Sequence, residues 1–359
     1  MDTASWFALP ERRSSTVRFA LSLALAGGGI FVALFVLWRV QDAWLLAFAS
    51  VVGAVLLRAA ADPVENRLGL SRSVTLAIIA VVLLLLVGGF SWLLGHQLRA
   101  QFTDLNSELA SALQYAQQNL GISLPGQDVQ QASGSGLSAL GSLMQQLFGT
   151  VVSVGGAVAG GVSAFVLVVV GAFFFAASPE MYRDGAVKLF PPPQHDRVKD
   201  ALNTAGRALR LWLLAQLVSM AVVGVMVLVG TWLIGLRAPL ALGLFAGITE
   251  FIPLIGPILG AVPAVLLALT HGLWTAVWTI VLFIIVQQIE SNLIQPLIQR
   301  HMVELPPALL LFAVVAVGLM FGITGLVVAA PLTVVLYVLV KKLYVRDTLG
   351  EATSVPGET

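Results

Sequence analysis

The chain has 359 residues, of which 58% are hydrophobic and only 10% are charged, whereas soluble proteins carry about 25% charged residues. A net charge of +1 provides no basic face for nucleic acid, and the absence of cysteine excludes disulfides, thiolate catalysis and iron–sulfur clusters. Four scattered histidines lack metal-ligand spacing, so we expect no metal and no cofactor. The composition predicts an all-α polytopic membrane protein. With no nucleophile–base pair or phosphate loop, we do not expect an enzyme.

Six apolar segments approach or exceed the length of about 20 residues that a helix needs to cross a bilayer. In chain order they are 19–37, 44–61, 74–95, 151–177, 211–234 and 273–289. The polar residues 1–18 are followed by no small-residue cleavage pattern, so the first segment is expected to be a membrane helix and not a signal peptide.

Basic residues predict how these spans are oriented. Fifteen of the 19 Lys and Arg residues lie before residue 19, in the loops 58–72 and 183–210, or after residue 340. All of these fall on one side if the spans alternate. Because short basic segments stay in the cytoplasm, we expect both termini to be cytoplasmic.

Hydrophilic segments between the spans divide the chain into six parts. Residues 96–150 are expected on the outer side, and residues 178–210 on the cytoplasmic side. In the latter, Ser178-Pro179-Glu180 begins one amphipathic helix, and three prolines separate it from a second helix at 196–209. The predicted parts are N-terminal membrane helices (1–95), an amphipathic outer insert (96–150), a fourth membrane helix (151–177), a cytoplasmic amphipathic segment (178–210), a transport core (211–345) and a disordered cytoplasmic tail (346–359).

Two apolar stretches of the core contain too many helix breakers for straight spans. Proline removes a backbone donor and clashes with the preceding turn. We therefore expect residues 239–269 to form two short helices, about 240–251 and 258–268. We expect residues 307–340 to form a second broken hairpin. Each is expected to be re-entrant or broken, giving about eight membrane segments in all. The residues expected at the breaks, or bonded to backbone groups freed there, are Pro253, Gly256, Pro257, Gly322, Gly325, Pro331, Thr249 and Thr324.

The two hairpins share a short sequence. Residues 243–249 and 318–324 are identical at five of seven positions with an offset of 75 residues. One span lies between them, so the second hairpin would enter from the opposite face. This predicts an inverted repeat, 211–269 against 273–340, which is typical of a transport site at the membrane midplane. The alternative is that Gly-rich apolar helices resemble each other by composition alone.

Polar side chains lie beside these breaks. Glu250 precedes Phe251-Ile-Pro253, and Glu290 follows the sixth span. Carboxylates in a membrane are expensive and become functional candidates, since one in a dry setting can carry a proton. The alternatives are a headgroup-level position for Glu250 and a pair with Arg300 or a helix N-terminus for Glu290. The candidate transport or coupling residues are Glu250, Glu290, Gln287, Asn292 and Gln295.

These residues also carry a resemblance to a known family. The motifs are ALGLFAGITEFIPLIGP at 241–257, ESNLIQP at 290–296 and FGITG at 321–325. They resemble the autoinducer-2 exporter family of bacterial permeases, from which the chain departs at Ala215, where a glycine would be more typical. The resemblance implies a homo-oligomeric permease of the bacterial inner membrane. Some members are assigned export of a furanosyl signalling molecule, and others look like sodium/proton antiporters.

Three functions follow from these observations. The leading interpretation is export of a small polar solute through a midplane site. The second is a sodium (or other monovalent cation)/proton antiporter that uses Glu250 and Glu290. The third is a non-transporting membrane scaffold, which would gain nothing from broken helices. Expected partners are the lipid bilayer, a small polar solute or sodium and protons, and further copies of the chain.

Overall fold

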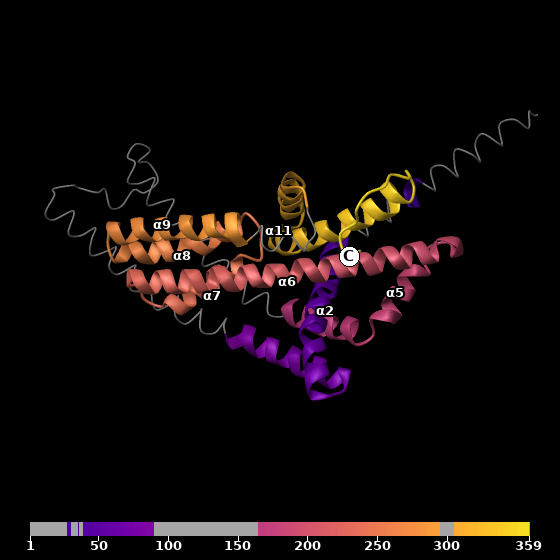
Figure 1. Ribbon diagram of the computed structural model, residues 1–359, viewed down its shortest axis with the longest axis horizontal. Helices are drawn as coiled ribbons and strands as arrows, with labels where there is room; N and C mark the ends of the chain where they lie inside the picture. Colours follow the sequence, from indigo (N-terminus) through magenta and orange to yellow (C-terminus); the bar gives the residue numbers. More distant parts are fainter. Residues whose placement is uncertain (1–26, 30–34, 36–38, 90–163, 295–304, 359) are drawn as a thin grey trace, which may run out of the picture. The chain divides into compact units, whose positions relative to one another are not determined.

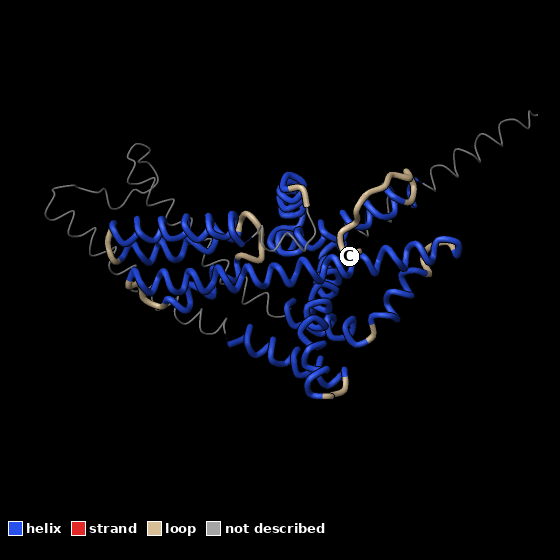
Figure 2. The backbone as a smooth tube through the Cα atoms, in the orientation of Figure 1, coloured by secondary structure: helices blue, strands red, loops and turns tan. Residues whose placement is uncertain are grey.

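Helices make up nearly all of the described chain (Figures 1 and 2). The computed structural model describes residues 27–29, 35, 39–89, 164–294 and 305–358. It divides into two compact units, residues 1–46 and 47–359. The first contains the beginning of α2 (Gln41–Leu68), and the second contains the rest of the described elements. The predicted span 19–37 lies almost entirely outside the described residues, and the insert 96–150 lies wholly outside them.

Five described helices are long and apolar enough to cross a membrane. They are Gln41–Arg67, Arg72–Gly89, Pro192–Ile234, Leu273–Ile294 and Pro307–Arg346. A sixth span is added if Ala164–Ala177 and α5 (Pro179–Val187), which meet at 84°, are counted together. Ser178 and Pro179 stand at this bend, where the sequence predicted a new helix. The all-helical prediction is thus confirmed for the described residues.

Helix α6 (His195–Ile234) differs from the prediction. We expected an amphipathic helix at 196–209 and a separate span at 211–234, but α6 is one helix of 40 residues. It follows a single 3-10 turn, Pro192–Gln194, and ends at Gly235, whose φ of 84° is the left-handed geometry of a helix C-terminus. No proline lies between these ends, so the change from polar to apolar residues near position 210 does not interrupt the hydrogen bonds.

The first predicted hairpin forms two short helices. Helix α7 (Pro239–Thr249) and helix α8 (Gly256–Thr270) are joined by a turn at 250–255, close to the predicted bounds. Helix α9 (Leu273–Ile289) follows and continues as a π-helical turn, η2 (Glu290–Ile294). Small residues bring α7 against α6: a Cβ built on Gly243 would lie 2.6 Å from the carbonyl oxygen of Gly224.

Helix α11 (Pro307–Leu339) contains the second predicted break. Gly322 has φ 63° and ψ −145°, which is not helical, so α11 consists of two arms. The second arm continues into a π-helix, η3 (Val340–Arg346), and packs on α6. The packing forms one hydrophobic cluster of buried side chains. It contains Ala205, Ala208, Leu209, Trp212 and Leu213 of α6, Ala330, Val334 and Val338 of α11, and Val355. Within the predicted tail, Val355 is buried against α6.

Candidate transport site

The turn between α7 and α8 gives the site its irregular backbone. Leu254 has a positive φ of 71°, and a Cβ on Gly256 would collide with the Thr249 carbonyl, so the chain reverses tightly here. Pro253 lies in the turn and Pro257 in the first turn of α8, where its missing N–H leaves no bond unmade. The Thr249 hydroxyl donates to the carbonyls of Phe245 and Ala246, each at 3.0 Å. Thr249 therefore bonds within its own helix.

Glu250 ends α7 and is 5% exposed. Its carbonyl oxygen accepts a 2.7 Å hydrogen bond from the Gln216 side chain of α6. The next residue, Phe251, packs edge-on against Trp212 with ring centroids 6.2 Å apart. The end of α7 is thus fixed to α6 by one polar and one aromatic contact.

Glu290 begins the π-helical turn and is 4% exposed. Its oxygen Oε1 accepts a 3.1 Å bond from the Ser219 hydroxyl of α6. Its oxygen Oε2 accepts bonds from Gln287 at 3.1 Å and Ser291 at 3.4 Å. A π-helical turn is rare and often marks a functional position, because the extra residue re-aims side chains. Gln287, another of the candidate residues, therefore bonds to Glu290.

One face of α6 therefore holds both carboxylate residues. Gln216 and Ser219 are three residues apart, which places them on the same side of the helix. Gln216 binds the end of α7 and Ser219 binds the end of α9. Both Glu250 and Glu290 are therefore held against this side of α6. Two buried carboxyl groups among hydroxyl and amide donors can bind a polar solute, a cation or a proton.

The other predicted residues are arranged differently. Asn292 donates to the backbone and side-chain oxygens of Gln288, at 2.9 and 2.8 Å, on an exposed face. Gln295 lies outside the described residues. In α11, Gly325 packs on the Val317 carbonyl, Thr324 is exposed and Pro331 is buried. Among the described residues, no group of three or more His, Asp and Glu could hold a metal.

Sequence reasoning missed Gln216 and Ser219. Both are polar residues within an apolar span, and this is the signal that could have identified them. Ser219 has no motif around it, and its partner is 71 residues away in the sequence.

Comparison with known proteins places the chain among transporters. The family model "AI-2E family transporter" matches residues 29–345. Among curated relatives, "Putative transport protein YrrI" of Bacillus subtilis is 26% identical over 46% of this chain and 47% of the relative. A "Putative transport protein" of Borreliella burgdorferi is 23% identical over half of each chain. "Putative transport protein MT0215" of Mycobacterium tuberculosis is 28% identical over 75% and 74%.

The chain spans about half the length of the first two of these relatives. The family model, in contrast, extends over most of the chain, including α6 to α11 and the motifs at Glu250 and Glu290. Family membership agrees with the apolar helices, which indicate a multi-pass membrane protein, and the proteins of this family are transport proteins and not enzymes. The chain belongs to the AI-2E family of transporters.

Proposed function

We propose that this permease moves a small polar solute out of the cell through a site formed by Glu250 and Glu290. One observation carries the proposal: two buried carboxyl residues, each at the end of a broken or distorted helix, are bonded to the same face of α6. The Glu290 carboxylate accepts hydrogen bonds from three neutral side chains, those of Ser219, Gln287 and Ser291. The hydroxyl groups of a solute can replace such neutral donors with little loss of hydrogen-bond free energy.

Each residue has a distinct part in this proposal. Glu290 accepts hydrogen bonds from the solute, and Ser219 and Gln287 orient its two oxygens. Glu250 presents a second carboxyl group, positioned by the Gln216 bond to its carbonyl. The turn at 250–255 supplies backbone groups outside a helix, which membrane proteins tolerate where they line a cavity.

The proposed arrangement in the membrane follows the sequence. We infer six full spans and two hairpins, α7–α8 and the two arms of α11, related as an inverted repeat in an inner-membrane homo-oligomer. The breaks fall at different places in the aligned segments, since Gly247 lies inside α7 and its counterpart Gly322 is the break in α11. The repeat would therefore relate whole hairpins and not individual residues. The basic segments put both termini and the first half of α6 in the cytoplasm.

The test is uptake of autoinducer-2 into inverted membrane vesicles, where export appears as accumulation. Wild-type protein should accumulate the solute, and Glu290→Gln and Glu250→Gln should each reduce the initial rate about tenfold or more, as expected for lost bonds to charged groups. Glu351→Gln, an exposed carboxylate far along the chain from both sites, is the matched control. Rates unaffected by either site variant would refute the assignment. Sodium-triggered proton movement that requires either carboxylate would instead favour the antiporter.

A further inference from the structure

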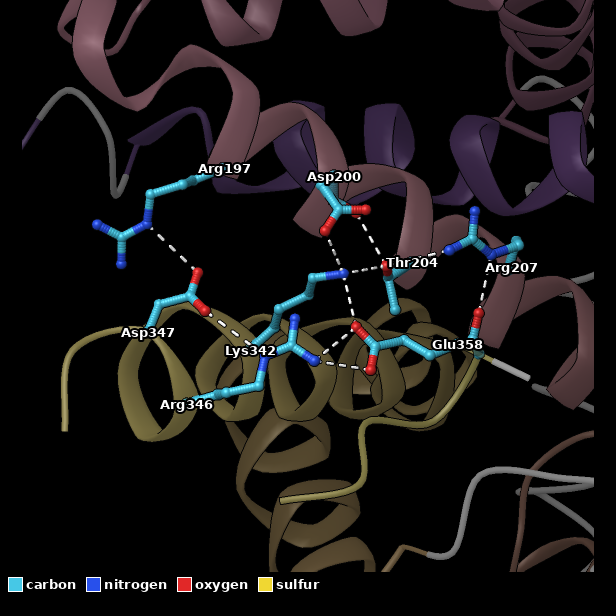
Figure 3. Close-up of polar contacts among 9 residues, drawn as sticks. Arg197, Asp200, Thr204, Arg207, Lys342, Arg346, Asp347 and Glu358 are labelled. Atoms are coloured by element: carbon cyan, nitrogen blue, oxygen red, sulfur yellow. Dashed lines mark hydrogen bonds and ion pairs between the residues drawn. The ribbon is translucent and has the colours of Figure 1, made fainter. Parts of the chain in front are cut away.

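A second polar cluster lies along the first half of α6 (Figure 3). It is centred on Lys342 of η3, whose side chain is only 3% exposed. The ammonium group lies 2.6 Å from the Asp200 carboxylate, 2.6 Å from the Thr204 hydroxyl and 2.8 Å from the Glu358 carboxylate. An ammonium has three N–H donors and no acceptor. Its three donors thus have three partners, two from α6 and one from the segment at 355–358.

This segment contacts both helices. Glu358 accepts two bonds from Arg346 of η3, at 2.8 and 2.7 Å, in addition to the bond from Lys342. On the α6 side, Arg207 donates a 2.8 Å bond to the Gly357 carbonyl, and Val355 is buried in the cluster around Trp212. Gly357 has φ 87°, and a Cβ there would lie 2.8 Å from the Thr204 carbonyl. The close fit depends on the absence of a side chain.

We propose that residues 355–358 are a latch that locks η3 onto the first half of α6 and so restrains the second arm of α11. The π-helical backbone of η3 supports this, because such turns are rare and are frequently found at functional sites. The buried position of Lys342 supports it too. A buried ammonium that loses one carboxylate partner is left poorly compensated, so latch and η3 are stabilised together.

The latch can control a conformational change because the two elements it joins, α6 and η3, belong to different parts of the core. Helix α6 carries Gln216 and Ser219, whereas η3 continues the arm of α11 that follows the break at Gly322. Any step that separates this arm from α6 must break either the bonds of Glu358 to η3 or the bond of Gly357 to α6, together with the bonds of Lys342 to Asp200 and Thr204. Opening of the latch then sets how often the arm is free to move.

The experiment is amide hydrogen exchange on the whole protein in lipid nanodiscs, read at Val340–Arg346. We compare Gly357→Ala with Gly350→Ala. Both glycines have positive φ, 87° and 75°, so both alanines strain the backbone, but a Cβ on Gly350 has no atom within 4 Å. Glu358→Gln and Glu351→Gln form a second pair, since Glu351 is exposed. Size-exclusion chromatography checks that each variant is folded.

Gly357→Ala and Glu358→Gln are expected to speed exchange at Val340–Arg346 by about tenfold or more, because exchange there reports local opening. The two control variants should stay within about twofold of wild type. The proposal is overturned if exchange at 355–358 rises while η3 stays protected, or if the controls have the same effect as the latch variants. No transported solute is needed, so this result is independent of the proposed function.

Discussion

A methyl group added at Gly243 tests whether the α6–α7 contact positions the site. The Cβ of Gly243→Ala would lie 2.6 Å from the Gly224 carbonyl oxygen and 2.6 Å from the Leu228 Cβ. Real Cβ atoms essentially never approach closer than 3.0 Å, and both obstacles are fixed to the α6 backbone. The two helices must therefore separate. Because Glu250 directly follows the last residue of α7, this separation also weakens the Gln216 bond to the Glu250 carbonyl.

The magnitude follows from two opposing terms. Replacing glycine by alanine inside a helix stabilises it by about 0.5–1 kcal/mol, whereas overpacking costs about 1–3 kcal/mol. Gly206→Ala is the matched control, because Gly206 lies inside α6 and a Cβ there has no atom within 4 Å. We expect Gly206→Ala to raise the free energy of unfolding and Gly243→Ala to lower it. The two variants should differ by about 1–3 kcal/mol.

The assay is heat or denaturant unfolding of both variants in the same detergent, followed by vesicle transport. Gly243→Ala should unfold first and transport more slowly, while Gly206→Ala should transport like wild type. Equal or greater stability of Gly243→Ala would show that α6 and α7 do not need this close approach. The role of the contact in positioning Glu250 would then be wrong.

Three further predictions concern single side chains. Ser219→Ala should slow solute accumulation in inverted vesicles about tenfold, because a hydrogen bond to a carboxylate contributes about 1.5–3 kcal/mol. The control Asn292→Ala, on the exposed face, should leave the rate of accumulation unchanged. Trp212→Ala should lower the free energy of unfolding by about 3–5 kcal/mol, measured in detergent, since Trp212 is buried between α6, Phe251 and α11. Lys342 holds the pKa of Glu358 below its usual range. The latch therefore adds stability above about pH 5 that is lost as the pH falls through this lowered pKa, and the pH profile of the unfolding midpoint should be flatter in Glu358→Gln.

Local chemistry explains what the sequence predicted well. The turn between α7 and α8 was predicted near its observed position because Pro253 and Pro257 lack a backbone donor whatever surrounds them. The exact break in α11 was harder to predict, since Gly322, Gly325 and Pro331 are all candidates. Only Gly322 leaves helical geometry, while Pro331 stays inside the helix.

Packing explains what the sequence did not reveal. The Ser219–Glu290 bond joins residues 71 positions apart, and no periodicity within either helix indicates it. Residues 346–359 have the polar, Gly-containing composition of a disordered tail. Within this segment, Glu358 and Val355 nevertheless contact partners on η3 and α6. A tail is ordered when a few specific contacts outweigh its composition, and those contacts exist only in the folded protein.

The length of α6 connects the two clusters. At 1.5 Å per residue, its 40 residues extend about 60 Å, twice the thickness of the hydrocarbon core. Thr204 and Ser219 are therefore about 22 Å apart on one helix without proline, and sharp kinks are usually found at proline or at local distortions of the hydrogen bonds. Such a helix does not absorb movement between latch and site by bending. Movement of the second arm of α11 against α6 must be absorbed within α11, and Gly322 is where its backbone already departs from the helix. Latch opening at Glu358 and rotation at Gly322 would then be two parts of one motion, with α6 and its carboxylate partners as the fixed frame.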